Sequence, residues 1–185
     1  TTLDSCLMTS PSFDWIAHHA SVRGDKLAVH DLDSDRKFTY SQMNERTSRL
    51  AAALREAFSI KRGDRVAVLA ENDSNFFEVQ FACWKLGAVF VPLNWRLSIP
   101  ELEYIVGDAD PDVIIHDDAF VDNATKLAEL CQIDHRISWG SDTQGSATYE
   151  EVLTSHEPLS GSEKCTHDDT LTIMYTSGTT GRPKG

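Results

Sequence analysis

Two patterns of hydrophobic and polar residues, one typical of strands and one typical of helices, alternate along this chain. Short, nearly continuous apolar runs such as 65–70 and 112–116 are rich in β-branched residues, as strands buried on both faces are. Between such runs, apolar residues recur at spacings of three and four, and over 43–58 they form the stripe of a helix that lies on a core. This alternation predicts an α/β fold, with a mostly parallel sheet that carries helices on both faces.

Capping and turn signals set the bounds of these predicted elements. Thr39 and Gln42 form the sequence of a capping box, and Ser74 is expected to cap the next helix. Gly87 is expected to end that helix, and Gly107 to close the one after it. The predicted strands are 26–30, 37–40, 65–70, 88–91, 112–116, 136–139 and 171–176, and the predicted helices are 39–58, 74–86, 98–106, 119–130 and 149–155.

Composition and charge narrow the class of protein. The chain has 185 residues, 41% hydrophobic and 25% charged, which is ordinary for one soluble globular domain. A formal net charge of -12 argues against a partner with a nucleic-acid backbone or an anionic membrane surface. No apolar stretch reaches the roughly 20 residues of a transmembrane helix, and the N-terminus does not resemble a secretory signal. The four cysteines form no C-x-x-C pair, so we predict a cytoplasmic protein with reduced thiols and no metal site made of side chains.

The last ten residues, 176–185, differ sharply from the rest. They contain three glycines, four hydroxyl residues, two cations and no acid. Glycines let the backbone turn several N–H groups inward, hydroxyls add donors, and a lysine supplies a compact positive charge. The pattern predicts a phosphate-binding loop; it matches neither a Walker A loop nor G-x-G-x-x-G, and a plain surface turn is the alternative. The candidate ligand-binding residues are Thr176, Ser177, Gly178, Thr179, Thr180, Gly181, Arg182 and Lys184.

The stretch 175–185, YTSGTTGRPKG, resembles the phosphate-loop signature of the adenylate-forming (AMP-binding) enzyme superfamily. That superfamily includes acyl-CoA synthetases, luciferases and the adenylation domains of peptide synthetases. Segments 38–40, 63–67, 86–89 and 91–94 also look like the opening of the family's large domain. The resemblance implies that residues 1–185 are an incomplete N-terminal part of that domain, without the small C-terminal domain. The chain has no initiator Met and ends within the motif, so we expect a fragment.

Within the superfamily, residues 92–97 (PLNWRL) look most like acyl-CoA and aryl-CoA ligases. The resemblance implies an ATP-dependent acid–thiol ligase. A small carboxylic acid attacks the α-phosphate of ATP to give an acyl-adenylate and pyrophosphate, and the thiol of coenzyme A then displaces AMP. ATP, Mg²⁺ and coenzyme A are the implied cofactors, and a homodimer of the parent enzyme is allowed. The loop would hold the β- and γ-phosphates; Arg96 is a candidate contact to a coenzyme A phosphate, although an ordinary exposed arginine is the favoured interpretation.

Two other functions stay open. The parent could be an adenylation domain that loads a carrier protein, or a non-catalytic nucleotide-binding remnant. The family's adenine-, ribose- and metal-binding motifs and the lysine of its small domain lie downstream of Gly185, so we expect this polypeptide alone to form no acyl-adenylate. The aspartates between 108 and 118 lack the offsets of a calcium loop, and we interpret them, with Asp168 and Asp169, as turn residues that face solvent.

Overall fold

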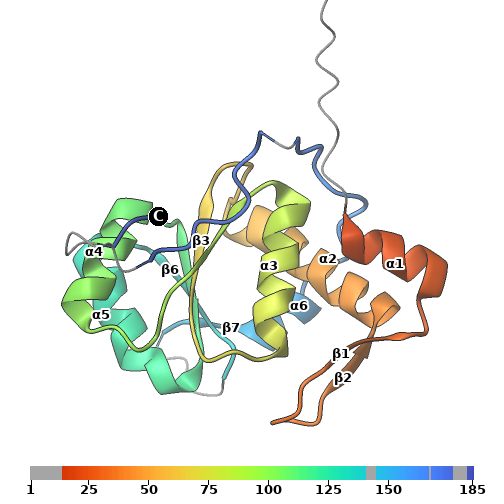
Figure 1. The fold of residues 1–185 in the computed structure, drawn as a ribbon, viewed down its shortest axis with the longest axis horizontal. Helices are drawn as coiled ribbons and strands as arrows, with labels where there is room; N and C mark the ends of the chain where they lie inside the picture. The colour runs from red at the N-terminus through yellow and green to blue at the C-terminus, as the bar shows by residue number, and fades with distance from the viewer. Residues whose placement is uncertain (1–13, 141–144, 167, 177–182) are drawn as a thin grey trace, which may run out of the picture.

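The computed structural model describes residues 14–140, 145–166, 168–176 and 183–185 (Figure 1). Within these ranges, no helix is both long enough and apolar enough to cross a membrane. The helices are α1 (Trp15–Arg23), α2 (Tyr40–Ala57), α3 (Ser74–Leu86), α4 (Ile99–Ala109), the 3-10 turn η1 (Asp118–Phe120), α5 (Val121–Cys131) and α6 (Tyr149–Thr154). The strands are β1 (Leu27–His30), β2 (Lys37–Thr39), β3 (Arg65–Leu69), β4 (Val89–Pro92), β5 (Val113–His116), β6 (His135–Ser138) and β7 (Ala147–Thr148).

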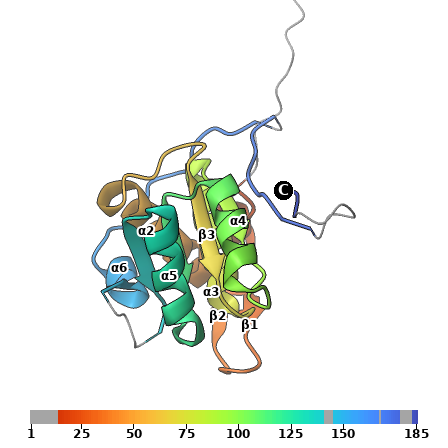
Figure 2. The same cartoon turned by 90° about the vertical axis from the view of Figure 1, so that its left-hand side faces the viewer.

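Five parallel strands in the order β4-β3-β5-β6-β7 form the central sheet. Side chains alternate between its faces: Val66 and Val68 of β3 join one apolar cluster, and Ala67 and Leu69 join the other. Helices α2, α3 and α6 cover the first face, and α4 and α5 cover the second; Figure 2 looks onto α4 and α5 with the sheet behind them. The predicted α/β class, with helices on both faces of a parallel sheet, is confirmed.

An outer layer lies against α2, on the side away from the sheet (Figure 1). It consists of α1 and the antiparallel hairpin β1–β2. The sequence analysis predicted the two strands of this hairpin, as 26–30 and 37–40, but not α1. Ile16 is the one buried residue of α1, so this helix carries no apolar stripe that a pattern search could find.

Helix caps were predicted with mixed success. The capping box of α2 is confirmed: Gln42 N lies 3.3 Å from Thr39 Oγ1, and Thr39 N lies 2.8 Å from Gln42 Oε1. The expected cap of α3 is wrong by one residue. Asp73 accepts from Phe76 N at 3.2 Å, while Ser74 is already helical. Both side chains are good caps, and Asp73 is the one that stands before the first helical residue.

The two predicted terminal glycines behave differently. Gly87 ends α3 in the left-handed region, with φ of 68°, as expected. The expectation that Gly107 closes α4 is wrong, since the helix continues to Ala109 and Asp110 takes the left-handed position with φ of 48°. The buried residues Val106 and Ala109 continue the apolar stripe past Gly107, so packing overrides the weak helix propensity of glycine.

The predicted strand 171–176 is not continuous. Thr172 makes a single parallel bridge with Phe90 of β4, through Phe90 N to Leu171 O and Ile173 N to Phe90 O, both 3.0 Å. Trp84 Nε1 also donates to Leu171 O, at 3.1 Å. A side chain of α3 therefore shares this carbonyl, and the segment pairs with β4 at a single bridge instead of forming a strand.

The aspartates interpreted as solvated turn residues bind backbone and side-chain donors. Asp112 Oδ2 accepts from Arg65 N, and Asp117 Oδ2 accepts from Glu71 N, both at 3.0 Å. Asp169 forms an ion pair with Arg62, whose Nε lies 3.0 Å from Asp169 Oδ1. These carboxylates stabilise turns through bonds to residues that are distant in the sequence. The local sequence pattern could not reveal these partners.

Candidate functional site

The two ends of the predicted phosphate loop, Thr176 and Lys184, pair with each other, and we call this pair the stem. Thr176 and Lys184 form an antiparallel bridge, with Thr176 N to Lys184 O at 3.0 Å and Lys184 N to Thr176 O at 3.1 Å. Both residues are exposed, and within the described part of the chain no carboxylate lies within 4.0 Å of the Lys184 ammonium. The other predicted residues lie outside the described ranges: Ser177, Gly178, Thr179, Thr180, Gly181 and Arg182.

The residue before the stem is tied to α4. Tyr175 donates its hydroxyl to Asp108 Oδ2 at 2.6 Å, and its ring packs against the apolar cluster under α4 and α5. Burial, followed by the hydrogen bond to Asp108, raises the pKa of Tyr175 above its ordinary value. The phenol is therefore a stable hydrogen-bond donor at neutral pH. The sequence analysis placed Tyr175 only within the motif and interpreted Asp108 as a turn residue, because the two partners are 67 positions apart.

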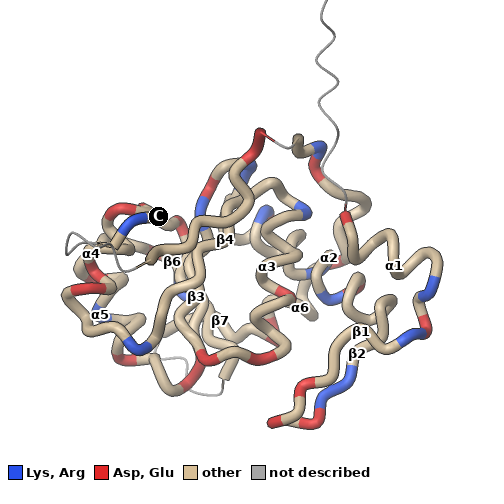
Figure 3. Tube along the Cα trace, in the orientation of Figure 1, with Lys and Arg blue, Asp and Glu red and all other residues tan. Residues whose placement is uncertain are grey.

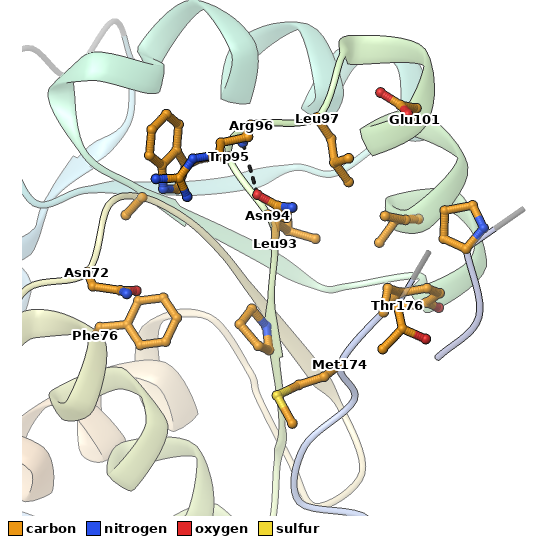
Figure 4. A pocket seen from close by; sticks show the side chains of 15 residues that line it. Asn72, Phe76, Leu93, Asn94, Trp95, Arg96, Leu97, Glu101, Met174 and Thr176 are labelled. Atoms are coloured by element: carbon orange, nitrogen blue, oxygen red, sulfur yellow. Dashed lines mark hydrogen bonds between the residues drawn. The ribbon is translucent and has the colours of Figure 1, made fainter. Parts of the chain in front are cut away.

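A cavity of about 540 Å³ opens beside this stem (Figure 4). It lies at the carboxyl ends of β3 and β4, where ligands of parallel sheets usually bind. Its lining combines apolar side chains with a few polar groups, as small-molecule sites do. Examples are Phe76, Leu93 and Met174 among the apolar residues, and Asn72, Asn94 and Thr176 among the polar ones.

The segment after β4 forms one wall of the cavity. The Arg96 guanidinium lies over the Trp95 ring, 4.0 Å from its centroid, and Arg96 N donates to Asn94 Oδ1 at 3.1 Å (Figure 4). Stacking of this kind contributes about 0.5–1 kcal/mol at an exposed site. Arg96 is exposed, as expected for an arginine after a strand, and its guanidinium lies on the Trp95 ring at the rim of the cavity.

The carboxylate that lines this cavity belongs to Glu101 and is hydrogen-bonded to Ser98. It accepts from Ser98 N at 2.8 Å and from Ser98 Oγ at 2.6 Å, and these two hydrogen bonds lower the pKa of Glu101. Over the described residues, no group of three His, Cys, Asp or Glu side chains could hold a metal ion.

Charge is unevenly placed around the stem. In Figure 3, a basic segment beside the C-terminus lies next to acidic segments of α4. The chain as a whole carries 29 acidic and 17 basic residues. A positively charged loop on an acidic protein attracts an anion locally, while the rest of the protein surface does not attract it.

Comparison with known proteins agrees with this geometry. The model of the AMP-binding enzyme family matches residues 16–185. The chain belongs to the AMP-binding enzyme family. As in other members, its fold is the N-terminal α/β fold of adenylate-forming enzymes. The chain superposes on a crystal structure of the inhibitor-bound N-terminal domain of FACL13 from Mycobacterium tuberculosis with a TM-score of 0.82 and 34% sequence identity. The superposition covers 93% of this chain and 42% of that one.

Curated relatives in the AMP-binding family are ligases. Indoleacetate–CoA ligase of Aromatoleum aromaticum is 33% identical over 173 residues, which cover 93% of this chain and 33% of that protein. A fatty acid–[acyl-carrier-protein] ligase, ScoC of Streptomyces coeruleorubidus, is 33% identical over 154 residues, covering 83% and 28%. The chain thus spans about a third of the length of the curated relatives it matches.

Proposed function

We propose that this chain is the N-terminal part of the large domain of an ATP-dependent acid–CoA ligase, which activates a carboxylic acid as an acyl-adenylate. The observation that carries this proposal is the closed stem Thr176–Lys184 beside a cavity at the carboxyl ends of β3 and β4. Family membership supports the adenylate-forming class, and the CoA ligases among the relatives support coenzyme A as acceptor.

In this proposal the loop binds the β- and γ-phosphates of ATP. The stem brings Thr176 and Lys184 together, and glycine-rich loops of this composition bind anions through their backbone amides. Lys184 stands at the base of the loop and would neutralise the charge that grows on the leaving pyrophosphate. The proposed ligand-binding residues are Thr176, Ser177, Gly178, Thr179, Thr180, Gly181, Arg182 and Lys184.

In this proposal Mg²⁺ binds together with the nucleotide. The described residues offer no cluster of three metal-ligating side chains, and the carboxylate that lines the cavity, Glu101, is bound to Ser98. Mg²⁺ typically bridges phosphate oxygens and keeps several waters, so it needs few protein ligands in this part of the chain. Its chemistry would be to neutralise phosphate charge.

A second candidate acceptor is a carrier protein. One relative of this chain is an acyl-carrier-protein ligase, whereas residues 92–97 favour coenzyme A. In this proposal Arg96, whose guanidinium lies over Trp95 at the cavity rim, is the candidate contact to a phosphate group of coenzyme A. Turnover of the full-length ligase with coenzyme A and with a carrier protein would decide between the two acceptors.

The substitution Lys184→Ala in the full-length ligase tests the phosphate role. Loss of one preorganised group that stabilises the transition state costs on the order of 10²–10³ in rate, so we expect acyl-adenylate formation to slow by about 100-fold. Carboxylate-dependent exchange of labelled pyrophosphate into ATP measures this step. Lys126→Ala, at an exposed position on α5, is the matched control and should leave the rate unchanged. An unaltered exchange rate in the Lys184 variant would refute the phosphate role.

A further inference from the structure

Tyr175, next to the stem, contacts two residues from different parts of the chain, Asp108 and Gly185. Tyr175 precedes Thr176 on one leg, and Gly185 follows Lys184 on the other, so these two face each other across the bridge. Asp108, in the last turn of α4, accepts the hydroxyl hydrogen of Tyr175 at 2.6 Å. The phosphate loop is therefore joined to the helical layer at a point next to its base.

Gly185 fits against Tyr175 because it has no side chain. A Cβ placed on Gly185 would lie 2.8 Å from Tyr175 Cζ and 2.8 Å from Ile173 Cγ2, which is closer than carbon atoms approach without displacement. The aromatic ring covers the glycine backbone on the opposite leg, a pairing that compensates for the missing side chain in a two-stranded segment. Any group added at Gly185 would push on the ring carbon that carries the Tyr175 hydroxyl.

We propose that Asp108, Tyr175 and Gly185 form a clamp that positions the phosphate loop, with Tyr175 and Asp108 as positioning residues for ATP. The proposal rests on the function proposed above. Segment 171–176 makes one bridge to β4, so this bridge alone attaches the stem to the edge of the sheet. The clamp adds a second attachment, because Tyr175 is hydrogen-bonded to α4, a helix whose Leu102, Ile105 and Val106 are buried in the core, and Gly185 packs against the Tyr175 ring.

The clamp makes a prediction that a purely structural role for Tyr175 does not. If the loop must be held at one angle to meet the phosphates, a loose clamp weakens ATP binding and leaves the binding of the carboxylic acid unchanged. If Tyr175 only fills the apolar layer, its hydroxyl contributes to stability alone. A split between the KM for ATP and the KM for the acid separates these two cases.

Four variants of the full-length ligase test the clamp. Tyr175→Phe keeps the ring and removes the donor, and Asp108→Ala removes the acceptor; each should raise the KM for ATP about fivefold, the scale of one lost hydrogen bond. Asp108→Asn keeps an acceptor oxygen in place and should retain a KM within about twofold of the wild type. The double variant Tyr175→Phe/Asp108→Ala should be no worse than either single change, since both remove the same bond.

Gly185→Ala provides a second route to the same result. The added methyl should displace the Tyr175 ring from Asp108 and raise the KM for ATP at least as much as Tyr175→Phe. Melting temperatures are measured in parallel for all variants. An unchanged KM for ATP in Tyr175→Phe and Asp108→Ala, whatever the melting temperature, would overturn the clamp, as would an Asn variant as impaired as the Ala variant.

Failure of the clamp and failure of the proposed function give different results. If Lys184→Ala slows adenylation while Tyr175→Phe leaves the KM for ATP unchanged, the loop binds phosphate but needs no clamp. If Lys184→Ala leaves adenylation unchanged, the phosphate role itself is wrong, and the clamp is refuted with it.

Discussion

The two faces of the central sheet are built by different rules. The face under α2, α3 and α6 buries charge: Glu78 and Lys85, both on α3, are 0% and 3% exposed. The face under α4 and α5 packs an apolar cluster, and among the described residues it buries no Asp, Glu, Lys or Arg; its buried polar side chains are His116 and Ser138, in register with Leu69. The contact of Tyr175 with Asp108 lies at the rim of this face, beside the cavity. One face is sealed by an ionic network that fixes how its helices fit together, whereas the other carries a polar contact next to the candidate site.

The network on the sealed face joins three helices. Glu78 of α3 accepts from Arg46 Nε of α2 at 2.7 Å and from the Tyr149 hydroxyl of α6 at 2.9 Å. Arg46 reaches on to Glu150, 2.6 Å from its Nη2 atom. Burial, together with the nearby Glu78 carboxylate, raises the pKa of Tyr149 well above its usual range, while the hydrogen bonds to Glu150 and Glu78 outweigh burial and raise the pKa of Arg46. Tyr149 thus stays a neutral donor and Arg46 a cation, as the network needs.

The largest effect is expected from breaking this network at its centre. Glu78→Ala leaves Arg46 and Tyr149 without their buried acceptor, so we expect a loss of about 3–5 kcal/mol in the free energy of unfolding. Denaturant titration measures the loss. The control is Glu150→Ala, which removes the half-exposed partner of the same arginine and should cost at most about 1 kcal/mol. Similar losses for the two variants would mean that burial does not distinguish the two carboxylates.

A smaller, pH-dependent effect is expected in the outer layer, where the β1–β2 hairpin meets the N-terminus of α3. Asp31 accepts from Ser34 N at 3.2 Å and contacts Ser74 Oγ at 3.3 Å, and hydrogen bonds led by those from Ser34 lower the pKa of Asp31 to about 2. A lowered pKa stabilises the fold above the ordinary value of 3.8, and this contribution is lost as the pH falls towards about 2. Because water screens part of this exposed turn, we expect Asp31→Asn to cost about 1 kcal/mol at pH 6.

The comparison between wild type and Asp31→Asn isolates this one carboxyl. The difference in the free energy of unfolding should shrink as the pH is lowered from about 4 to about 2, because the wild-type carboxyl then becomes protonated as well. Urea titrations at several pH values measure that difference. A difference that stays constant with pH would show that Asp31 acts through its shape and not through its charge.

The sequence predicted the layers of this fold because layers depend on local periodicity. Apolar runs such as 65–70 identified the buried parallel strands, and the stripe over 43–58 identified α2. The two residues of the stem were also among the predicted site residues, since Thr176 and Lys184 belong to one short motif. What periodicity reports is which residues are buried, and burial is decided within a few turns of helix or strand.

Contacts between distant segments could not be predicted in the same way. Asp108 was interpreted as a solvated turn residue, yet its partner Tyr175 lies 67 positions away. The same holds for Asp169 with Arg62, 107 positions apart. A carboxylate in a polar run gives no sign of its partner until the fold brings the two together, so the polar contacts that complete the candidate site were missed.

The smallest expected effect tests Gly107, on the face that carries the site, where sequence and structure disagree. If glycine were the left-handed cap of α4, alanine would be strained there and would destabilise the protein by about 1 kcal/mol. The structure puts Gly107 inside α4, exposed, with nothing within 4 Å of the place that an alanine Cβ would occupy. Gly107→Ala should therefore stabilise the protein by about 0.5–1 kcal/mol, measured by thermal and urea unfolding, and leave the KM for ATP unchanged although its neighbour Asp108 belongs to the clamp. A loss of stability would instead indicate that α4 ends at Gly107, and Asp108 would then not belong to the last turn of the helix.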